Sequence, residues 1–255
     1  MKRERAYVDN RRNKILEIMG AQPEMKVEEL AKMFEVSPVT IRRDLQYLED
    51  QHKLTRFYGG ATVKEKKELE MDEVNSYREL IAAYAASLVE DEDTLFINTS
   101  ATALKILNYI DKNNVTVITN NGRAINCEQK EGLNVILTGG ELRHPKEAMV
   151  GDFAIRNVQP VFAKKSFLGC SGFSEECGMT TENANEVNIN ALMIKNALNE
   201  TYLLADHTKI GNNSSFISCT IDQIGNLITD ELAPEELLEG IRERGVKIHV
   251  VKKNM

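Results

Sequence analysis

Three stretches of helical periodicity occupy the start of the chain. In the range 11–19, four apolar side chains cluster on one helical face, and the glycine and proline that follow predict the end of this helix. From Val27 the apolar positions recur three, four and seven residues later, which predicts a second, short helix. Ser37 followed by Pro38 is typical of an N-cap and a first helical position, so a third helix is expected to begin there.

The third helix has the composition of a recognition helix. Apolar residues fall on one side of it, and the remaining positions near its start carry Val39, Thr40, Arg42, Arg43 and Gln46. The N-terminal residues of a recognition helix reach base edges, while arginine and hydroxyl groups bind phosphate or guanine. A plain three-helix bundle with a solvated face shares the same core pattern, and periodicity alone does not choose between the two.

A short segment after the third helix indicates a hairpin. Residues 53–62 alternate like strands around a glycine pair, which predicts a wing beside the helix-turn-helix, with side chains that can contact flanking phosphates. The candidate DNA contacts are Ser37, Val39, Thr40, Arg42, Arg43, Gln46, Lys53, Arg56 and Tyr58.

The chain beyond the wing is predicted to form a separate, larger domain. A charged stretch with few structure-forming signals suits a linker, and an amphipathic helix with Tyr77 and Leu88 on its apolar face follows it. We therefore expect a DNA-binding domain over 1–62, a linker over 63–74 and a second domain over 75–255.

Strand-like and helical patterns alternate in the second domain. Apolar runs are found at 94–98, 115–120, 133–138, 166–169, 201–205, 226–229 and 246–251, and helical patterns at 101–110, 183–198 and 234–244. This alternation predicts an α/β fold with a mainly parallel sheet and helices on both faces. In such open sheets ligands bind beyond the carboxyl ends of the strands.

The loops expected at those strand ends are rich in small, hydroxyl and amide side chains. They include 98–102, 119–121, 138–143, 169–172 and 206–209. Such residues at the start of a helix offer backbone and side-chain donors to a phosphate group, and Lys209 adds a positive charge. The same residue types are common helix caps, so each loop by itself also fits an ordinary turn.

Composition and charge narrow the class of protein. Of the 255 residues, 42% are hydrophobic and 28% charged, and no apolar run approaches the length of a membrane span, so we expect a cytoplasmic globular protein without membrane contact. The four cysteines and four histidines show no metal-ligand spacing, and we expect no cofactor and no metal. The net charge of −7 divides into +4 for residues 1–67 and −11 for residues 68–255, as in a basic nucleic-acid-binding part joined to an acidic body.

The combined motifs resemble the DeoR family of bacterial transcriptional regulators. The N-terminal resemblance is carried by Val27–Ala31, Val36-Ser37, Thr40–Leu45, Leu48-Glu49 and Gly59–Ala61, and it implies a helix-turn-helix over 25–44 within a DNA-binding domain over 7–62. The C-terminal resemblance is carried by Thr119-Asn120, Gly139–Arg143, Phe167–Gly169, Gly178–Thr181, Ala205-Asp206, Lys209 and Ile228–Asp230.

The resemblance implies a fold similar to ribose-5-phosphate isomerase, and a phosphorylated sugar or related metabolite as effector. The implied effector-binding residues are Asn98, Thr99, Ser100, Thr102, Asn120, Gly140 and Lys209. The chain departs from the family pattern in the first loop, where Asn98 stands for the usual aspartate and Ser100 for the usual glycine, and at Asn190, which aligns with a frequent lysine. The expected partners are double-stranded operator DNA, the effector and further copies of the chain in a homodimer or homotetramer.

Two other functions remain to be weighed against a regulator, most often a repressor of carbohydrate genes. A sugar-phosphate isomerase or deaminase would need acid–base groups, for which Glu141, Glu147, Asp206 and His207 are the candidates. A DNA-binding protein whose second domain only oligomerises would respond to no small molecule.

Overall fold

The computed structural model describes residues 2–51, 53–63, 66–128 and 130–253. The chain divides into two compact units, Met1–Glu73 and Val74–Met255, which we call the N-terminal and C-terminal units. No helix within the described residues combines the length and the apolar character required to cross a membrane.

The N-terminal unit is a winged helix-turn-helix. Its elements are α1 (Lys2–Ala21), β1 (Glu24–Lys26), α2 (Val27–Met33), α3 (Pro38–Asp50), β2 (Thr55–Phe57) and β3 (Gly60–Thr62). The three strands form an antiparallel sheet in the order β1-β3-β2. Ser37 caps α3 as expected, since its hydroxyl accepts a hydrogen bond from the Thr40 amide at 3.2 Å. Ile15, Leu30 and Leu45 are fully buried where the three helices meet.

Two helices begin earlier than the periodicity predicted. Helix α1 begins at Lys2 rather than near residue 11, and residues 66–74 of the expected linker form the first part of α4 (Lys66–Ser87). Both extensions are rich in lysine, arginine and glutamate, which favour helix without producing an apolar stripe. Hydrophobic periodicity therefore could not detect them.

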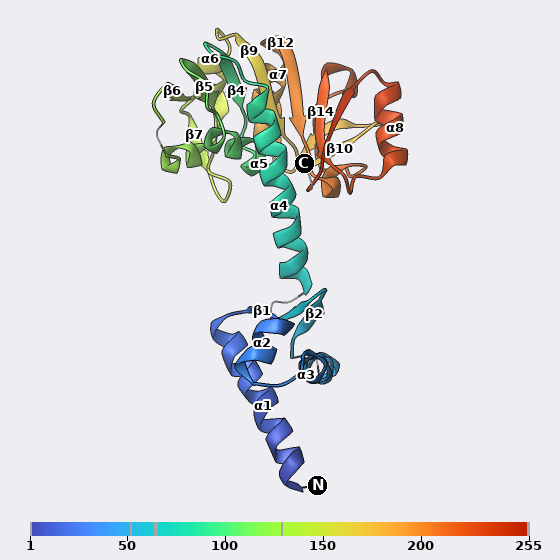
Figure 1. The fold of residues 1–255 in the computed structure, drawn as a ribbon. Helices are drawn as coiled ribbons and strands as arrows, with labels where there is room; N and C mark the ends of the chain where they lie inside the picture. Colours follow the sequence, from blue (N-terminus) through green and yellow to red (C-terminus); the bar gives the residue numbers. More distant parts are fainter. Residues whose placement is uncertain (1, 52, 64–65, 129, 254–255) are drawn as a thin grey trace. The chain divides into compact units, whose positions relative to one another are not determined.

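A seven-stranded sheet forms the centre of the C-terminal unit (Figure 1). Its strands are β4 (Thr94–Ile97), β5 (Val115–Thr119), β6 (Leu133–Leu137), β9 (Ala163–Gly169), β12 (Ala197–Leu204), β14 (Asn226–Asp230) and β15 (Lys247–Val251). They lie in the order β15-β14-β12-β9-β4-β5-β6, and every neighbouring pair is parallel. The seven predicted strands are all present, and the predicted α/β class is confirmed.

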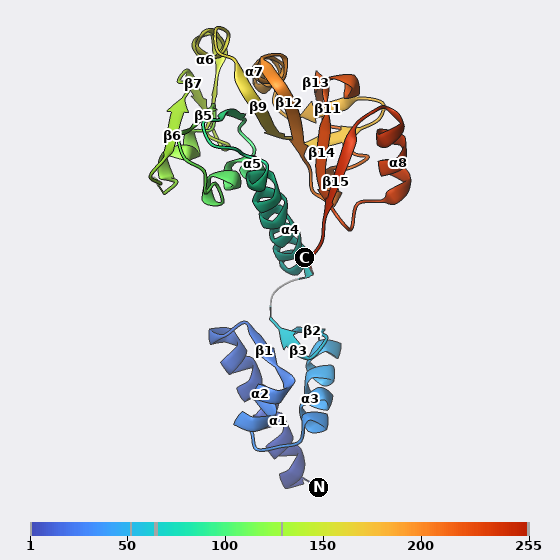
Figure 2. The ribbon, with the colours of Figure 1, turned by 45° about the horizontal axis from the view of Figure 1, so that its top comes forward.

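Helices cover both faces of this sheet, because successive strand residues point to opposite sides. On β4, Leu95 and Ile97 pack with α4 and with α5 (Ala101–Leu104), whereas Phe96 packs with the helices of the other face. Those helices are α6 (Gly151–Val158), α7 (Ala184–Lys195) and α8 (Glu235–Glu243). Figure 1 shows α4 and α5 in front of the sheet and α7 behind it, and Figure 2 shows α8 beside β15 at one edge.

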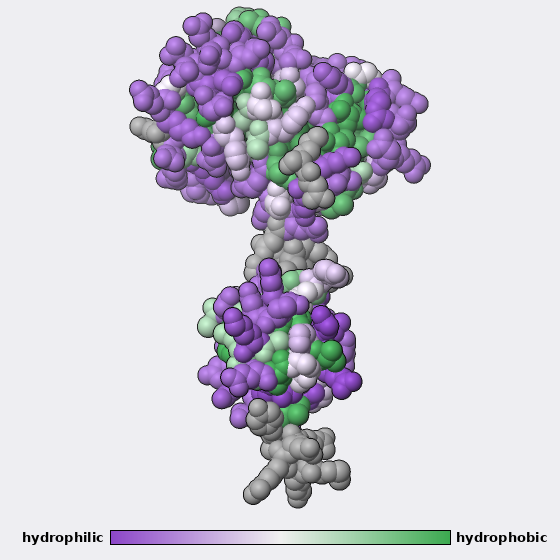
Figure 3. All heavy atoms as spheres, in the orientation of Figure 1, coloured by the Kyte–Doolittle hydropathy of each residue, from purple (hydrophilic) through white to green (hydrophobic). Residues whose placement is uncertain are grey.

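Several short elements surround the carboxyl ends of the strands. A hairpin consists of β7 (Glu141–Arg143) and β8 (Ala148–Val150), and a second sheet contains β10 (Gly172–Ser174), β11 (Gly178–Thr181) and β13 (Phe216–Cys219). Short 3-10 helices are η1 (Lys105–Asn108), η2 (Gly122–Asn126), η3 (His207–Lys209) and η4 (Ile221–Gln223). Hydrophilic side chains cover most of the visible surface of this unit (Figure 3).

Candidate functional site

A cavity of about 260 Å³ lies at the carboxyl ends of the central strands. The chain leaves β4 through α5 on one face of the sheet and leaves β9 through α7 on the other, so the connections diverge between these two neighbouring strands. Ligands of open α/β sheets bind at such a switch point. The cavity is lined by Arg78, 98–102, Asn121, Arg123, Lys146, 169–171, Thr181, Glu182, Glu186, Leu204, Asp206 and Lys209.

Asn98 joins the two strands at the base of the cavity. Its amide nitrogen donates to the Gly169 carbonyl at 2.9 Å, and its amide oxygen accepts from the Gly169 and Ser100 amides at 3.0 and 3.2 Å. The same nitrogen also donates to Asn190 Oδ1 at 3.1 Å. Two of the departures from the family pattern, Asn98 and Asn190, therefore contact each other as a neutral amide pair.

Ser100 lies between β4 and β9 and depends on a neighbouring glycine. Its hydroxyl accepts from the Ala103 amide at 3.3 Å and so caps α5. A Cβ on Gly169 would lie 1.9 Å from that hydroxyl oxygen, so only glycine leaves room for Ser100 at this place. The Gly169 backbone and the Ser100 side chain share one corner of the cavity.

The structure brings five of the seven implied effector residues to the cavity. Asn98, Thr99, Ser100, Thr102 and Lys209 line it.

The other two, Asn120 and Gly140, do not line the cavity and support its walls. The Asn120 amide is fully buried and donates to Thr99 Oγ1 at 3.1 Å. Gly140 has a φ of +110°, and a Cβ there would lie 2.6 Å from the Val150 carbonyl oxygen.

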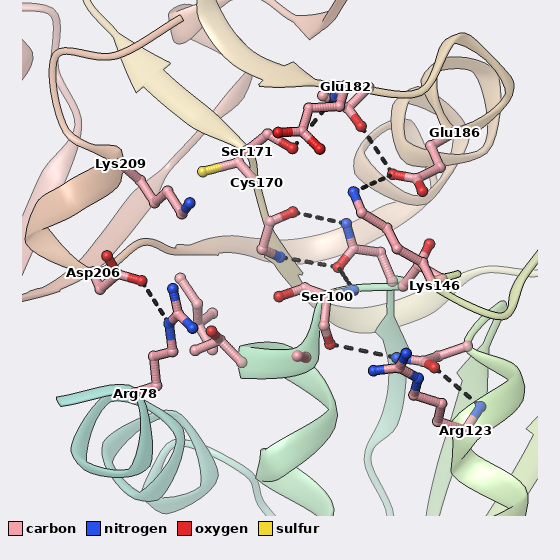
Figure 4. A pocket seen from close by; sticks show the side chains of 18 residues that line it. Arg78, Ser100, Arg123, Lys146, Cys170, Ser171, Glu182, Glu186, Asp206 and Lys209 are labelled. Carbon is pink, nitrogen blue, oxygen red and sulfur yellow. Dashed lines mark hydrogen bonds and ion pairs between the residues drawn. The ribbon is translucent and has the colours of Figure 1, made fainter. Parts of the chain in front are cut away.

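The sequence analysis did not predict three cationic side chains of the cavity. Arg78 comes from α4, Arg123 from η2 and Lys146 from the turn between β7 and β8, and with Lys209 they face three carboxylates, Glu182, Glu186 and Asp206. In Figure 4, Lys209 and the Arg78–Asp206 pair lie on one side and Lys146 with Arg123 on the other. Arg78 and Lys146 come from a helix and a hairpin turn outside the expected strand-end loops, and Arg123 lies two residues beyond the loop 119–121.

Ionic contacts fix the two sides of the cavity. Arg78 Nε donates to Asp206 Oδ2 at 2.8 Å. Burial by itself would raise the pKa of Asp206, but hydrogen bonds from Thr208 and Arg78 outweigh it, so the pKa lies below the ordinary value. On the other side, Lys146 Nζ lies 3.8 Å from Glu186 Oε2. Lys209, in contrast, forms no ion pair with the described part of the chain.

Two of the candidate acid–base residues are held by other side chains. Asp206 is held by Arg78, and His207 Nδ1 lies 2.8 Å from Asp230 Oδ1. Of the four sequence candidates only Asp206 lines the cavity. Burial raises the pKa of the cavity thiol Cys170 to about 12, so it remains protonated at neutral pH and is a poor nucleophile. Among the described residues there is no cluster of three metal-binding side chains.

The N-terminal unit presents the candidate DNA contacts on its surface. Eight of the nine are exposed and Thr40 is half-buried. Val39 is 53% exposed, and Tyr58 is fully exposed in the wing. A groove between α3 and the wing is lined by residues that include Arg42, Arg56 and Tyr58.

The candidate contacts differ in how free they are. Arg42 and Arg43 form no ion pair with any described residue, so both guanidinium groups are available. Arg56 Nε lies 3.1 Å from Glu49 Oε2, and Gln46 Nε2 donates to Asp50 Oδ1 at 2.9 Å. These two side chains would have to exchange a protein partner for a DNA partner.

Comparisons with known proteins match both units. The family model described as "DeoR C terminal sensor domain" matches residues 74–231, and the one described as "DeoR-like helix-turn-helix domain" matches residues 11–67. Among curated relatives, the chain is 33% identical over 251 residues to the HTH-type transcriptional regulator YulB of Bacillus subtilis (strain 168), covering 96% of this chain and 97% of that one.

Two further relatives are described as repressors. The HTH-type transcriptional repressor GlcR of Bacillus subtilis (strain 168) is 29% identical, over 97% of this chain and 98% of its own. The lactose phosphotransferase system repressor of Staphylococcus aureus (strain NCTC 8325 / PS 47) is 30% identical, over 91% of this chain and 95% of its own.

Solved structures are similar only at the level of the fold. A ribose 5-phosphate isomerase from Plasmodium falciparum has a TM-score of 0.37 at 13% identity and covers 52% of each chain. The eIF2B beta protein from Chaetomium thermophilum has a TM-score of 0.45 at 15% identity and covers 69% of this chain and 56% of its own.

Proposed function

Because this chain belongs to the DeoR family of transcriptional regulators, we propose that it represses carbohydrate genes by binding operator DNA and that a phosphorylated sugar controls the binding. The observation that carries the proposal is the cavity, which combines four cationic side chains with hydroxyl groups at a strand switch point. Such a site suits binding of an anionic polyol better than its chemical conversion.

The phosphate group is proposed to bind beside Lys209 and the loop 98–102. Lys209 has no ion-pair partner among the described residues, so its charge is available to a ligand. Thr99, Ser100 and Thr102 add hydroxyl groups on the same side of the sheet. Asn120 and Gly140 act indirectly in this proposal, by holding the Thr99 wall and the start of the β7–β8 hairpin.

DNA binding is assigned to α3 and the wing. Arg42 and Arg43 are proposed to contact bases or phosphates in the major groove, and Lys53, Arg56 and Tyr58 to contact the flanking backbone. The regulator would act in the cytoplasm as a homodimer or homotetramer, since paired half-sites are usual for helix-turn-helix proteins. Sedimentation of the free chain and of its DNA complex would give the number of copies.

The central experiment is a fluorescence-anisotropy titration of the protein onto the DNA upstream of its own gene, at fixed salt. The titration is repeated with glucose 6-phosphate, fructose 1-phosphate, fructose 6-phosphate and ribose 5-phosphate. We expect specific binding and a change in DNA affinity with at least one of these compounds. Specific binding without any change would favour an oligomerisation-only second domain, and no specific binding would contradict the proposal.

A pair of lysine variants tests the site itself. Lys209→Ala should bind DNA as the wild type does but lose its response to the active sugar phosphate, because the unpaired charge is gone. Lys252→Ala removes an exposed lysine elsewhere in the same unit and should respond normally. An equal loss of response in both variants would argue against a specific role for Lys209.

A further inference from the structure

Three consecutive residues of α4 contact segments that contain or follow the loops with the candidate effector residues. The first contact is Arg78, whose Nε donates to Asp206 Oδ2 at 2.8 Å. Asp206 opens the loop that also holds Lys209, and both residues line the cavity. The Asp206 side chain is 1% exposed and that of Arg78 20% exposed, so this contact is largely shielded from water.

The residues on either side of Arg78 make further contacts. Tyr77 donates its hydroxyl to Glu231 Oε1 at 3.3 Å, and its ring lies edge-on to the ring of His207, with 5.9 Å between the ring centroids. Glu79 contacts the segment that follows α5, where its carboxylate accepts hydrogen bonds from Lys105 Nζ and Tyr109.

These partners connect to both sides of the cavity. Lys105 lies in η1, which continues α5, and α5 begins at the cavity residue Ser100. The Asp206 loop follows β12, whereas α5 follows β4. Adjacent residues of one helix therefore hold two loops that come from different strands, and a change in the separation of these loops must act on α4.

Helix α4 also continues toward the DNA-binding domain. It is unbroken from Lys66 to Ser87, and three residues of sequence separate its start from the wing strand β3. A continuous helix moves as a rigid element, so a shift at residues 77–79 is carried to its first turn. The division between the two units falls within α4, after Glu73.

The guanidinium of Arg78 has the geometry to meet a ligand. With Nε on Asp206 and Nη1 on Asn75 Oδ1 at 3.3 Å, Nη2 has no partner among the described residues. Figure 4 shows the group pointing from α4 into the cavity, on the same side as Lys209. A phosphate bound between them would be contacted by one charge that belongs to a loop and one that belongs to the helix.

We propose that Arg78 binds the anionic group of the effector. Glu79 is in this proposal a positioning residue, through which binding of the effector in the cavity changes the position of α4. This inference rests on the proposed function. A ligand shifts an equilibrium only if it binds the two states unequally. Contact with Arg78 makes the two affinities unequal. The ligand binds the guanidinium that Asp206 holds in the free protein, and so favours one position of α4.

The test separates binding from coupling. In the full-length chain we would measure the dissociation constant of the active sugar phosphate by calorimetry, and the ratio of DNA affinities without and with saturating ligand. Arg78→Lys keeps the positive charge but loses the planar set of guanidinium N–H donors, and should weaken ligand binding about tenfold or more. Glu79→Gln should leave ligand affinity within about threefold but reduce the affinity ratio by about threefold or more.

Two further variants show whether the effect of Glu79→Gln comes from the lost hydrogen bonds or only from the lost charge. Tyr109→Phe removes the second hydrogen bond to Glu79 without changing any charge, and should reduce the ratio in the same direction. Glu243→Gln makes the same change as Glu79→Gln at an exposed site on α8, and should change nothing. Circular dichroism of each variant shows whether it folds.

The outcomes also distinguish this inference from the proposed function. A wild-type chain that responds to a sugar phosphate, together with a Glu79→Gln variant of undiminished ratio, overturns the coupling through α4 and leaves the proposed function intact. Ligand affinity unchanged in Arg78→Lys overturns the contact with Arg78. A wild-type chain that responds to no sugar phosphate overturns both.

Discussion

Asp44 is the point on which two arginines of the first helix converge. Its carboxylate is 2% exposed and lies 2.6 Å from Arg11 Nε and 2.9 Å from Arg12 Nε, while the Arg12 guanidinium also lies 3.7 Å from the centroid of the Tyr47 ring. These contacts tie α1 to α3. The aspartate of the T-I-R-R-D-L string is thus structural, although it lies between residues that face outward.

Replacing Asp44 should destabilise the N-terminal unit. Asp44→Ala removes the buried carboxylate that pairs with Arg11 and Arg12, which costs about 3 kcal/mol in the free energy of unfolding. Urea unfolding followed by circular dichroism would measure the loss. Asp9→Ala removes a 56% exposed acid 3.8 Å from Arg12 and should cost less than about 1 kcal/mol. Equal effects in the two variants would contradict the role of Asp44.

His249 makes stability depend on pH. Burial lowers the pKa of His249, and the nearby charge of Lys247 lowers it further while Glu200 acts in the opposite direction. The ring lies 2.8 Å from the Tyr84 hydroxyl and 3.1 Å from Asn226 Oδ1. Because the unfolded chain takes up this proton more readily, stability present above about pH 6.5 is lost as the pH falls below it.

A histidine variant isolates this contribution. Free energies of unfolding measured between pH 8 and pH 5 should decline more for the wild type than for His249→Gln. Both proteins share every other titrating group, so the difference between the two curves belongs to His249. Parallel curves would show that the histidine titrates alike in the folded and unfolded chain.

The sequence predicted elements well where one chemical signal defined them. The N-cap Ser37 with Pro38 marked the start of α3, and apolar runs marked all seven strands of the parallel sheet. Strands of three residues, such as β1 and β7, have too few positions to show alternation. They form because a neighbouring strand pairs with them. Such pairing depends on tertiary structure and leaves no local pattern in the sequence.

The candidate site was predicted only in part for a related reason. Loops that follow parallel strands meet at one sheet edge, and five of the seven residues implied by the resemblance line the cavity there. Arg78 and Lys146 reach it from a helix and a hairpin whose packing no local pattern encodes. The hydrogen bonds between Asn98 and Gly169 join two strands and depend on tertiary packing, so the sequence did not predict them.

At the level of α3, the free arginines should dominate DNA recognition. Arg43→Ala is expected to weaken operator binding by about 1–3 kcal/mol and relax specificity if Arg43 contacts a base, or to weaken all DNA alike and lower the salt slope by about one if it contacts a phosphate. Anisotropy titrations at several salt concentrations on operator and random DNA distinguish the two. Lys252→Ala serves as the control, and unchanged binding by Arg43→Ala would remove it from the interface.

The whole molecule consists of two units that each have a core of their own. Ile15, Leu30 and Leu45 belong to the core of the first unit, while the second has a core on each face of its sheet. A domain with a complete core folds independently. The family matches divide at the same place in the chain, with one model covering 11–67 and the other 74–231.

A fragment of residues 74–255 should therefore fold and keep its ligand. We expect it to bind the active sugar phosphate with the affinity of the full chain, within about threefold, and to bind no operator DNA. Calorimetry and anisotropy would measure the two activities. A folded fragment that had lost its ligand would show that residues before Val74 contribute to the cavity.

The chemistry of the cavity wall has one more consequence, which concerns acidity inside the cell. Its base is built from amides and hydroxyls, none of the described residues that line it is a histidine, and its thiol stays protonated. The phosphate of the proposed ligand has its second ionisation at about pH 6. We therefore expect the affinity for the sugar phosphate, measured between pH 5 and pH 8, to follow that ionisation, so that acidification would weaken the response while the sugar phosphate itself stayed abundant.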